Sequence, residues 1–190
     1  MDGMLIRSVD QDLELTGDGR TILGLLAPYE TPALVDDGFG PYWEMFRRGC
    51  FDRPMKGSPS YLRVQLEHNG HWVGRGNEWR DGPRGLAAAL RLDPTEAGRE
   101  AAFKVRDGQT PGLSLGFRIS EASDANRYER IDGRKVLVRT RVKALHHVAL
   151  CQQPAYVDAQ VEAVRSAPAD AGPPPRLAYW QEWTERVKRV

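Results

Sequence analysis

A serine between two glycines is the centre of the residues that could do chemistry. The stretch from Gly112 to Gly116 reads G-L-S-L-G, with Ser114 in its middle. A serine hydroxyl is a weak nucleophile until a nearby base takes its proton, so the question is whether a base reaches Ser114. The chain has four histidines, in two clusters that flank this serine: His68, His71, His146 and His147. A serine, a histidine base and a third group that orients the base would together catalyse acyl transfer.

Three other interpretations of these residues stay open. The G-x-S-x-G spacing also matches the nucleophile elbow of α/β-hydrolases, which needs a strand before its serine and a helix after it. Here a helical pattern precedes Ser114 and a β-prone run follows it. The spacing His68-x-x-His71, with one histidine of the tandem pair further along the chain, would supply three nitrogen ligands for zinc. A purely structural role for the histidines is the third interpretation.

The composition is that of an ordinary globular protein. The chain has 190 residues, of which 41% are hydrophobic and 28% charged, and its formal net charge is +1. So small a net charge gives no case for nucleic acid or an anionic membrane as the main partner. No apolar run is long enough to span a bilayer, and the N-terminus lacks the apolar core of a signal peptide. Cys50 and Cys151 are therefore expected to be free thiols in a reducing compartment.

Hydrophobic alternation predicts about eight short strands and one central helix. The clearest strands are expected over residues 22–27, 61–66, 73–79, 86–92, 112–119 and 142–151, with a hairpin over 128–138. The helix is expected to begin near Thr95 and to end at Gly108. Residues 28–59 are rich in proline and glycine, and their aromatic residues predict an irregular loop pinned to the body, with a short helix inside it.

These elements predict the α+β class, as a mainly antiparallel β-barrel with helices packed on it. Residues 1–165 are expected to form the main domain, with a short helix over 156–164. Residues 166–175 are rich in alanine and proline and predict an extended linker. Residues 176–190 carry an apolar face and predict a short C-terminal helix.

Four blocks of sequence carry a family resemblance. They read GLLAPY at 24–29 with YWEMFRRGCF at 42–51, LEHNGHWVGR at 66–75, GQTPGLSLGF at 108–117 and LHHVALCQQPA at 145–155. Together they resemble the prohead, or capsid maturation, proteases of HK97-type tailed bacteriophages, which are relatives of the herpesvirus assemblin proteases. The match extends over residues 5–165, and its specificity lies in the order and spacing of the blocks.

The resemblance implies a herpesvirus-protease-like fold and a Ser-His-His triad. Ser114 is the implied nucleophile and His68 the implied general base. His147 stands where many phage members have glutamate, and the herpesvirus relatives use a second histidine as third member, so His147 is preferred over His146. Only one of the two can face His68, because alternation sends neighbouring side chains to opposite faces of a strand. The flanking glycines are expected to leave backbone room for substrate, and neither a metal nor a cofactor is implied.

The same resemblance implies a serine endopeptidase of procapsid maturation. Its expected partners are the major capsid protein and the scaffold or delta segment, inside a procapsid in the host cytoplasm. A homodimer is also expected by resemblance, whereas nucleic acid and membrane are not expected as partners. The alternative is a non-enzymatic capsid assembly or scaffold module of the same fold, whose C-terminal helix docks on a partner.

Overall fold

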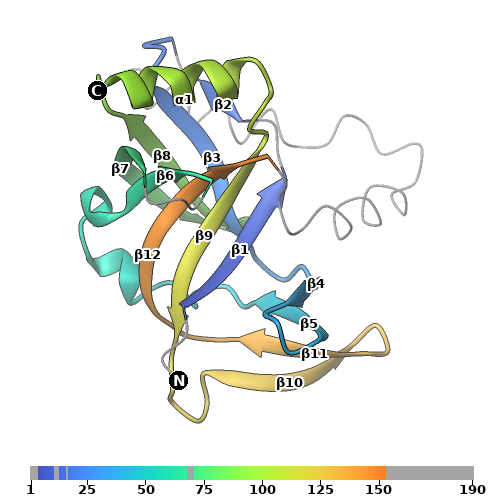
Figure 1. Ribbon diagram of the computed structural model, residues 1–190. Coiled ribbons are helices and arrows are strands. Elements are labelled where there is room, and N and C mark those ends of the chain that lie inside the picture. Colours follow the sequence, from blue (N-terminus) through green and yellow to red (C-terminus); the bar gives the residue numbers. More distant parts are fainter. Residues whose placement is uncertain (1–3, 11–12, 16, 68–70, 153–190) are drawn as a thin grey trace, which may run out of the picture.

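Two β-sheets and one α-helix make up the described part of the chain (Figure 1). The computed structural model describes residues 4–10, 13–15, 17–67 and 71–152. The helix expected over 156–164, the linker over 166–175 and the helix over 176–190 lie outside these residues, so the domain boundaries stay predictions. No helix within the described ranges is long and apolar enough to cross a membrane.

The larger sheet has eight strands and curls into an open half-barrel (Figure 1). In spatial order these are β1 (Met4–Asp10), β9 (Gly112–Ile119), β12 (Val142–Cys151), β6 (Arg63–Leu66), β7 (Trp72–Gly82), β8 (Gly85–Leu92), β3 (Thr21–Pro28) and β2 (Glu14–Leu15). Strands β12 and β6 run parallel, and the other neighbouring pairs run antiparallel. Within the described residues, β1 and β2 end the sheet without pairing to each other, so the expected barrel is an open, curled sheet.

The smaller sheet corrects the prediction for residues 28–59. Its order is β10 (Asn126–Ile131), β11 (Arg134–Arg139), β5 (Pro41–Phe46) and β4 (Ala33–Asp36). Two strands therefore lie in a segment predicted to be an irregular loop, followed by the 3-10 helices η1 (Pro54–Lys56) and η2 (Pro59–Tyr61). The strands form because β5 pairs in parallel with β11, which lies about ninety residues further along the chain. Pairing with so distant a strand cannot be predicted from the local sequence. Two aromatics of this segment, Phe46 and Phe51, are buried in the main core, as expected.

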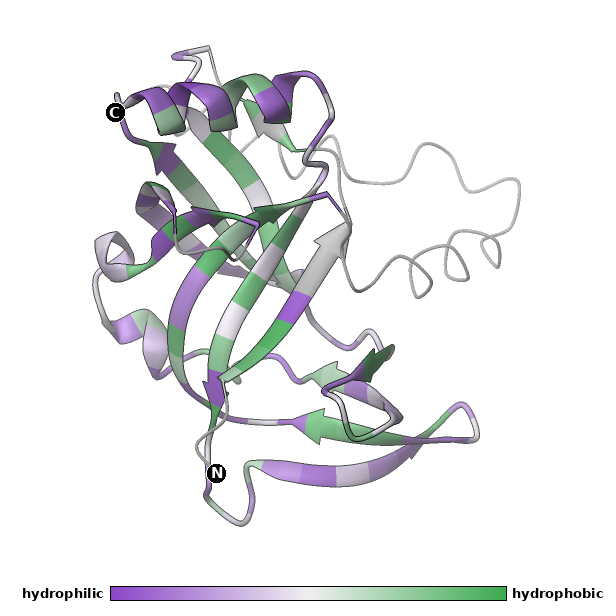
Figure 2. Cartoon of the chain, in the orientation of Figure 1, coloured by the Kyte–Doolittle hydropathy of each residue, from purple (hydrophilic) through white to green (hydrophobic). Residues whose placement is uncertain are grey.

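The helix α1 (Glu96–Arg106) forms where the sequence predicted it. The Thr95 side chain accepts a hydrogen bond of 3.2 Å from the Gly98 backbone N–H, which caps the first turn. Gly108 follows the helix with φ +71, a conformation that favours glycine. One face of α1 is apolar and buried, and the other is strongly polar (Figure 2). The apolar face packs against β7 and β8 and closes one end of the sheet.

The two faces of the larger sheet differ in what they cover. Leu113 and Leu115 of β9, with Val148 and Leu150 of β12, point into the main hydrophobic core. Because side chains alternate along a strand, Ser114 and its neighbours on the same face point the other way, onto the outer face of the sheet. The position of Ser114 is thus fixed by the inward-facing leucines on either side of it.

A buried ionic cluster joins the two sheets. Arg7 of β1 and Arg139 of β11 both donate to the carboxylate of Glu44 on β5, with the Arg139 Nε lying 2.7 Å from its Oε1. The Glu44 side chain is fully buried. Arg7 also forms a two-bond pair with Asp37, at 2.7 and 2.9 Å, and donates to the Tyr42 hydroxyl at 2.8 Å. Two guanidiniums thus balance two carboxylates at the junction, which fixes the smaller sheet against β1.

The cluster predicts an acid-sensitive contribution to stability. Burial alone would raise the pKa of Asp37, but the hydrogen bonds from Arg7 and Tyr42 and the charges of Arg7 and Arg139 outweigh it and lower that pKa. Because the folded pKa is depressed, the stabilisation is present above the ordinary aspartate pKa of about 4 and is lost as the pH falls through the folded value. The difference in Tm between the wild type and Asp37→Asn should therefore shrink below about pH 4. Two Tm curves that stay parallel from pH 7 to pH 2.5 would contradict this assignment.

Cys50 and Cys151 form no disulfide with each other, as the sequence predicted, and both are buried. Burial, with the nearby carboxylates of Asp81 and Asp52, raises the pKa of the Cys50 thiol. A buried thiol of raised pKa is a poor nucleophile, so Cys50 packs as a small apolar residue.

Candidate active site

Ser114 lies in the middle of β9, a strand with partners on both edges. Its Cα is in register with Ser8 of β1 on one side and with Ala149 of β12 on the other. The side chain is fully buried, and its Oγ has no hydrogen-bond partner among the described residues. An unpartnered buried hydroxyl is costly and uncommon in a folded protein. Ser114 therefore stands out chemically as well as by its sequence.

The register of β12 against β9 decides which of the tandem histidines shares the face of Ser114, because Ala149 lies opposite Ser114 and the pairing is unbroken from there to His147. The pairing of β12 with β9 shifts register between Leu145 and His147, and His147 then stands directly opposite Gly116. Directly opposed residues point to the same face, and Gly116 is two positions from Ser114, so His147 lies on the outer face with the serine. His147 is 6% exposed, whereas His146 is exposed.

The imidazole of His147 occupies the space that a side chain at position 116 would fill. A Cβ built on Gly116 would lie 2.6 Å from the ring Cε1, 2.9 Å from Nδ1 and 3.0 Å from Nε2. The sequence suggested that Gly116 leaves room for substrate, and the structure shows that this room holds the histidine ring instead. Positions 114 and 116 lie about 7 Å apart along the strand face.

Strand β6, which precedes His68 in the sequence, pairs with the edge of β12 that faces away from β9. Gln65 of β6 is in register with Ala149, so β6 lies two strand spacings, about 10 Å, from β9. Glu67 stays attached to β12, since its N–H donates to the Leu150 carbonyl and its Oε1 accepts from the Gln152 N–H, both at 2.9 Å. His68 follows directly in the sequence but lies outside the described residues, so its side chain is not placed.

Glu67 has an unusual backbone conformation. Its φ is +55, in the left-handed region that a glutamate rarely adopts. Such conformations cluster at functional sites, where surrounding contacts hold them. Here the contacts are the two hydrogen bonds to β12, and the strained residue immediately precedes the expected base. The conformation of Glu67 depends on β12, which lies more than eighty residues further along the chain.

The surroundings of Ser114 argue against the nucleophile elbow. In the elbow a strand precedes the serine and a helix follows it. Here α1 precedes β9, and β9 is itself a strand that pairs antiparallel with both its neighbours. The zinc alternative needs His68, which lies outside the described residues, so it stays an untested prediction. His71 is exposed just before β7.

Comparison with solved structures shows which class of fold this is. The chain is similar to the capsid assembly protease gp21 of bacteriophage T4, with a TM-score of 0.50 and 10% sequence identity. The similarity covers 77% of this chain and 96% of the T4 chain. The fold, a mostly β structure with a curled sheet, is therefore similar to that of a phage capsid protease.

The sequence identifies the family. The family model described as caudovirus prohead serine protease matches residues 10–171, which is most of the chain. The chain belongs to this family, so the recognition made from the four blocks is confirmed. No curated protein matches it. The relation to the herpesvirus proteases stays an expectation drawn from the sequence.

Proposed function

We propose that this chain is a serine endopeptidase that cleaves capsid or scaffold protein inside the procapsid of a tailed phage or phage-like particle. Ser114 is the nucleophile, His68 the general base and His147 the third member. The one observation that carries the proposal is the pair on the outer face of the sheet. Ser114 and His147 lie two residue positions apart on that face, with the ring of His147 seated over Gly116.

In the proposed mechanism, His68 takes the proton of the Ser114 hydroxyl as its oxygen attacks the scissile carbonyl. His68 then gives that proton to the leaving amine, and an acyl-enzyme remains on Ser114. Water, activated by the same histidine, attacks the ester carbonyl and releases the second product. His147, as a neutral imidazole, accepts a hydrogen bond from His68 and orients it, which stabilises the charged form less strongly than a carboxylate would.

A second candidate function rests on the burial of Ser114. A fully buried serine cannot meet a substrate carbonyl unless this face opens, so the same fold could serve as a non-enzymatic assembly module. A fluorophosphonate probe separates the two functions. The protease should be labelled at Ser114, identified by peptide mass spectrometry, and should shorten a co-expressed capsid protein from its own phage. An unlabelled chain that leaves the capsid protein intact would favour the assembly module.

The close approach of the His147 ring to Gly116 leads to a specific prediction. Gly116→Ala adds one methyl group where the ring lies, so the imidazole must move, and an error of about 1 Å in such a group can cost roughly 100-fold in rate. We expect kcat/KM to fall by about that factor while the Tm stays close to wild type. Gly17→Ala is the matched control, because a Cβ there meets nothing within 4 Å.

A double-mutant cycle ties this effect to the histidine. In a His147→Ala background there is no ring to displace, so adding Gly116→Ala should cost little more. If the loss of kcat/KM in the double variant equals the product of the losses in the two single variants, Gly116 acts through something other than His147. Unchanged activity in the single variant would show that His147 has no role in the chemistry.

A further inference from the structure

The outer face of the larger sheet carries an ordered set of side chains around the proposed site. Register pairs across the sheet place Ile6, Gly116, His147, Arg63 and Arg75 in one row, running from β1 through β9, β12 and β6 to β7. Residues paired in this way point to the same face. The row therefore passes directly beside Ser114, with the β1 residue on one side of it and the two arginines on the other.

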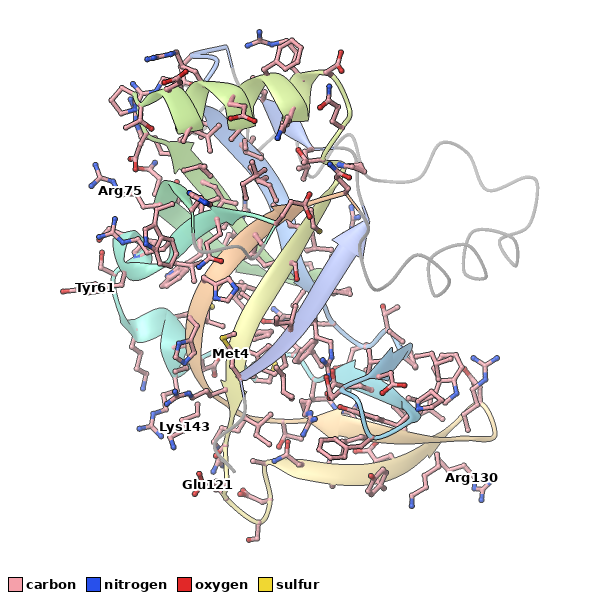
Figure 3. The ribbon with its side chains drawn as sticks, viewed as in Figure 1. Met4, Tyr61, Arg75, Glu121, Arg130 and Lys143 are labelled. Atoms are coloured by element: carbon pink, nitrogen blue, oxygen red, sulfur yellow. The ribbon has the colours of Figure 1, made fainter. Side chains whose placement is uncertain are left out.

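The two sides of Ser114 differ in chemistry. On β1, Met4 and Ile6 are 43% and 37% exposed, so two large apolar side chains face solvent on this strand. On β6 and β7, Arg63 and Arg75 are exposed, and neither makes a hydrogen bond or ion pair within the residues that the structure describes. Exposed Arg141, in contrast, pairs with the carboxylate of Asp124. Figure 3 shows Met4 at the start of β1 and Arg75 projecting from the left edge of the molecule.

We propose that the substrate is an extended polypeptide segment that crosses the strands on this face, with an apolar residue over Met4 and Ile6 and an acidic residue against Arg63 and Arg75. The inference rests on the proposed function, whose nucleophile lies between the two groups. Unpaired guanidiniums beside the site favour carboxylates by charge and by their planar donor geometry. The exposed apolar pair gives up water contact when a hydrophobic side chain covers it.

The strand spacing sets the expected substrate pattern. Neighbouring strands lie about 4.8 Å apart and an extended peptide advances about 3.3 Å per residue. Strand β1 is one spacing from β9, and β6 is two spacings from it on the other side. The apolar residue should therefore lie one or two positions from the scissile bond, and the acidic residue about three positions away on the opposite side.

The test is a randomised 12-residue peptide library, used in two arms. In the first, wild-type enzyme cuts the library, and the products should be enriched in that apolar and acidic pattern. The double variant Arg63→Glu/Arg75→Glu should lose the acidic enrichment and gain lysine or arginine at the same position. Ile6→Ser should lose the apolar enrichment alone. Arg130→Glu, an exposed arginine on the smaller sheet, is the control and should leave the profile unchanged.

The second arm measures binding without cleavage. It therefore tests the proposed substrate-binding face separately from the proposed peptidase activity. Immobilised Ser114→Ala should retain acidic peptides about three- to tenfold better than their Glu→Gln counterparts, and the preference should weaken with salt. The double arginine variant should abolish this preference. If neither cleavage nor binding depends on acidic residues in the peptide, this face is not the substrate-binding surface. The same conclusion follows if the protein retains a single-stranded oligonucleotide more tightly than the peptides. Selective retention of acidic peptides with no cleavage by the wild type would refute only the peptidase.

Discussion

Ser114→Ala is expected to abolish capsid processing when the variant is co-expressed with the capsid protein of the same phage. Removing the nucleophile of a triad leaves only binding and electrostatic contributions, so the rate of processing should fall by at least about 10⁴-fold. The fold should not change, because alanine fits the space that serine leaves and the Oγ has no partner to lose among the described residues. Processing followed by gel electrophoresis, with the Tm of the purified variant, checks both statements.

The proposed base, His68, gives this prediction its internal control. His68→Ala should cost about as much as Ser114→Ala, and the double variant should be no worse than either, because members of a triad act as one unit. Ser120→Ala, which alters another buried serine just beyond the end of β9, should leave processing intact. Normal processing by Ser114→Ala would remove Ser114 from the chemistry, and independent losses from Ser114 and His68 would separate the two residues.

Glu44→Gln is expected to have the largest effect on stability. The carboxylate of Glu44 is fully buried and accepts from both Arg7 and Arg139. Neutralising it leaves two buried guanidiniums facing one remaining carboxylate, and breaking such a buried pair costs about 3–5 kcal/mol. For a chain of this size, the Tm should fall by roughly 6–20 °C.

An exposed ion pair supplies the matched control for that prediction. Glu100 pairs with Lys104 one turn along α1, where it is 56% exposed. Exposed pairs of this kind contribute little to stability, so Glu100→Gln should shift the Tm by about a degree or two at most. Equal shifts from Glu44→Gln and Glu100→Gln would mean that the junction cluster is not a structural link between the sheets.

Local alternation was enough to locate the strands that carry the site. The inward leucines on either side of Ser114 predicted β9 over 112–119, and the apolar run after Val142 predicted β12 over 142–151, as found. The helix before β9 was equally visible, because its Thr95 cap and its closing Gly108 are local signals. Sequence reasoning therefore placed Ser114 on a strand entered from a helix, which was the decisive step against an elbow.

Features that depend on distant partners could not be predicted from local pattern. Strand β5 pairs with β11, and Glu44 meets Arg139 across 95 residues of sequence. The choice between His146 and His147 needed the register of β12 against β9, which places His147 opposite Gly116 and on the face of Ser114. The role of Gly116 likewise appears only once β12 lies beside β9, because the ring that fills its space belongs to the other strand.

Strand β9 has a partner strand on each edge, and this bears on how a tetrahedral intermediate would be held. A strand between two others directs its N–H groups along the sheet to those partners, so they do not point at the outer face. An oxyanion forming above Ser114 needs donors about 2.7–3.1 Å away that aim at it. The amides of β9 are therefore unsuited to that task, and the donors must come from another segment. The enzyme would then keep its nucleophile in the rigid middle of the sheet and assemble its oxyanion hole from a different part of the chain.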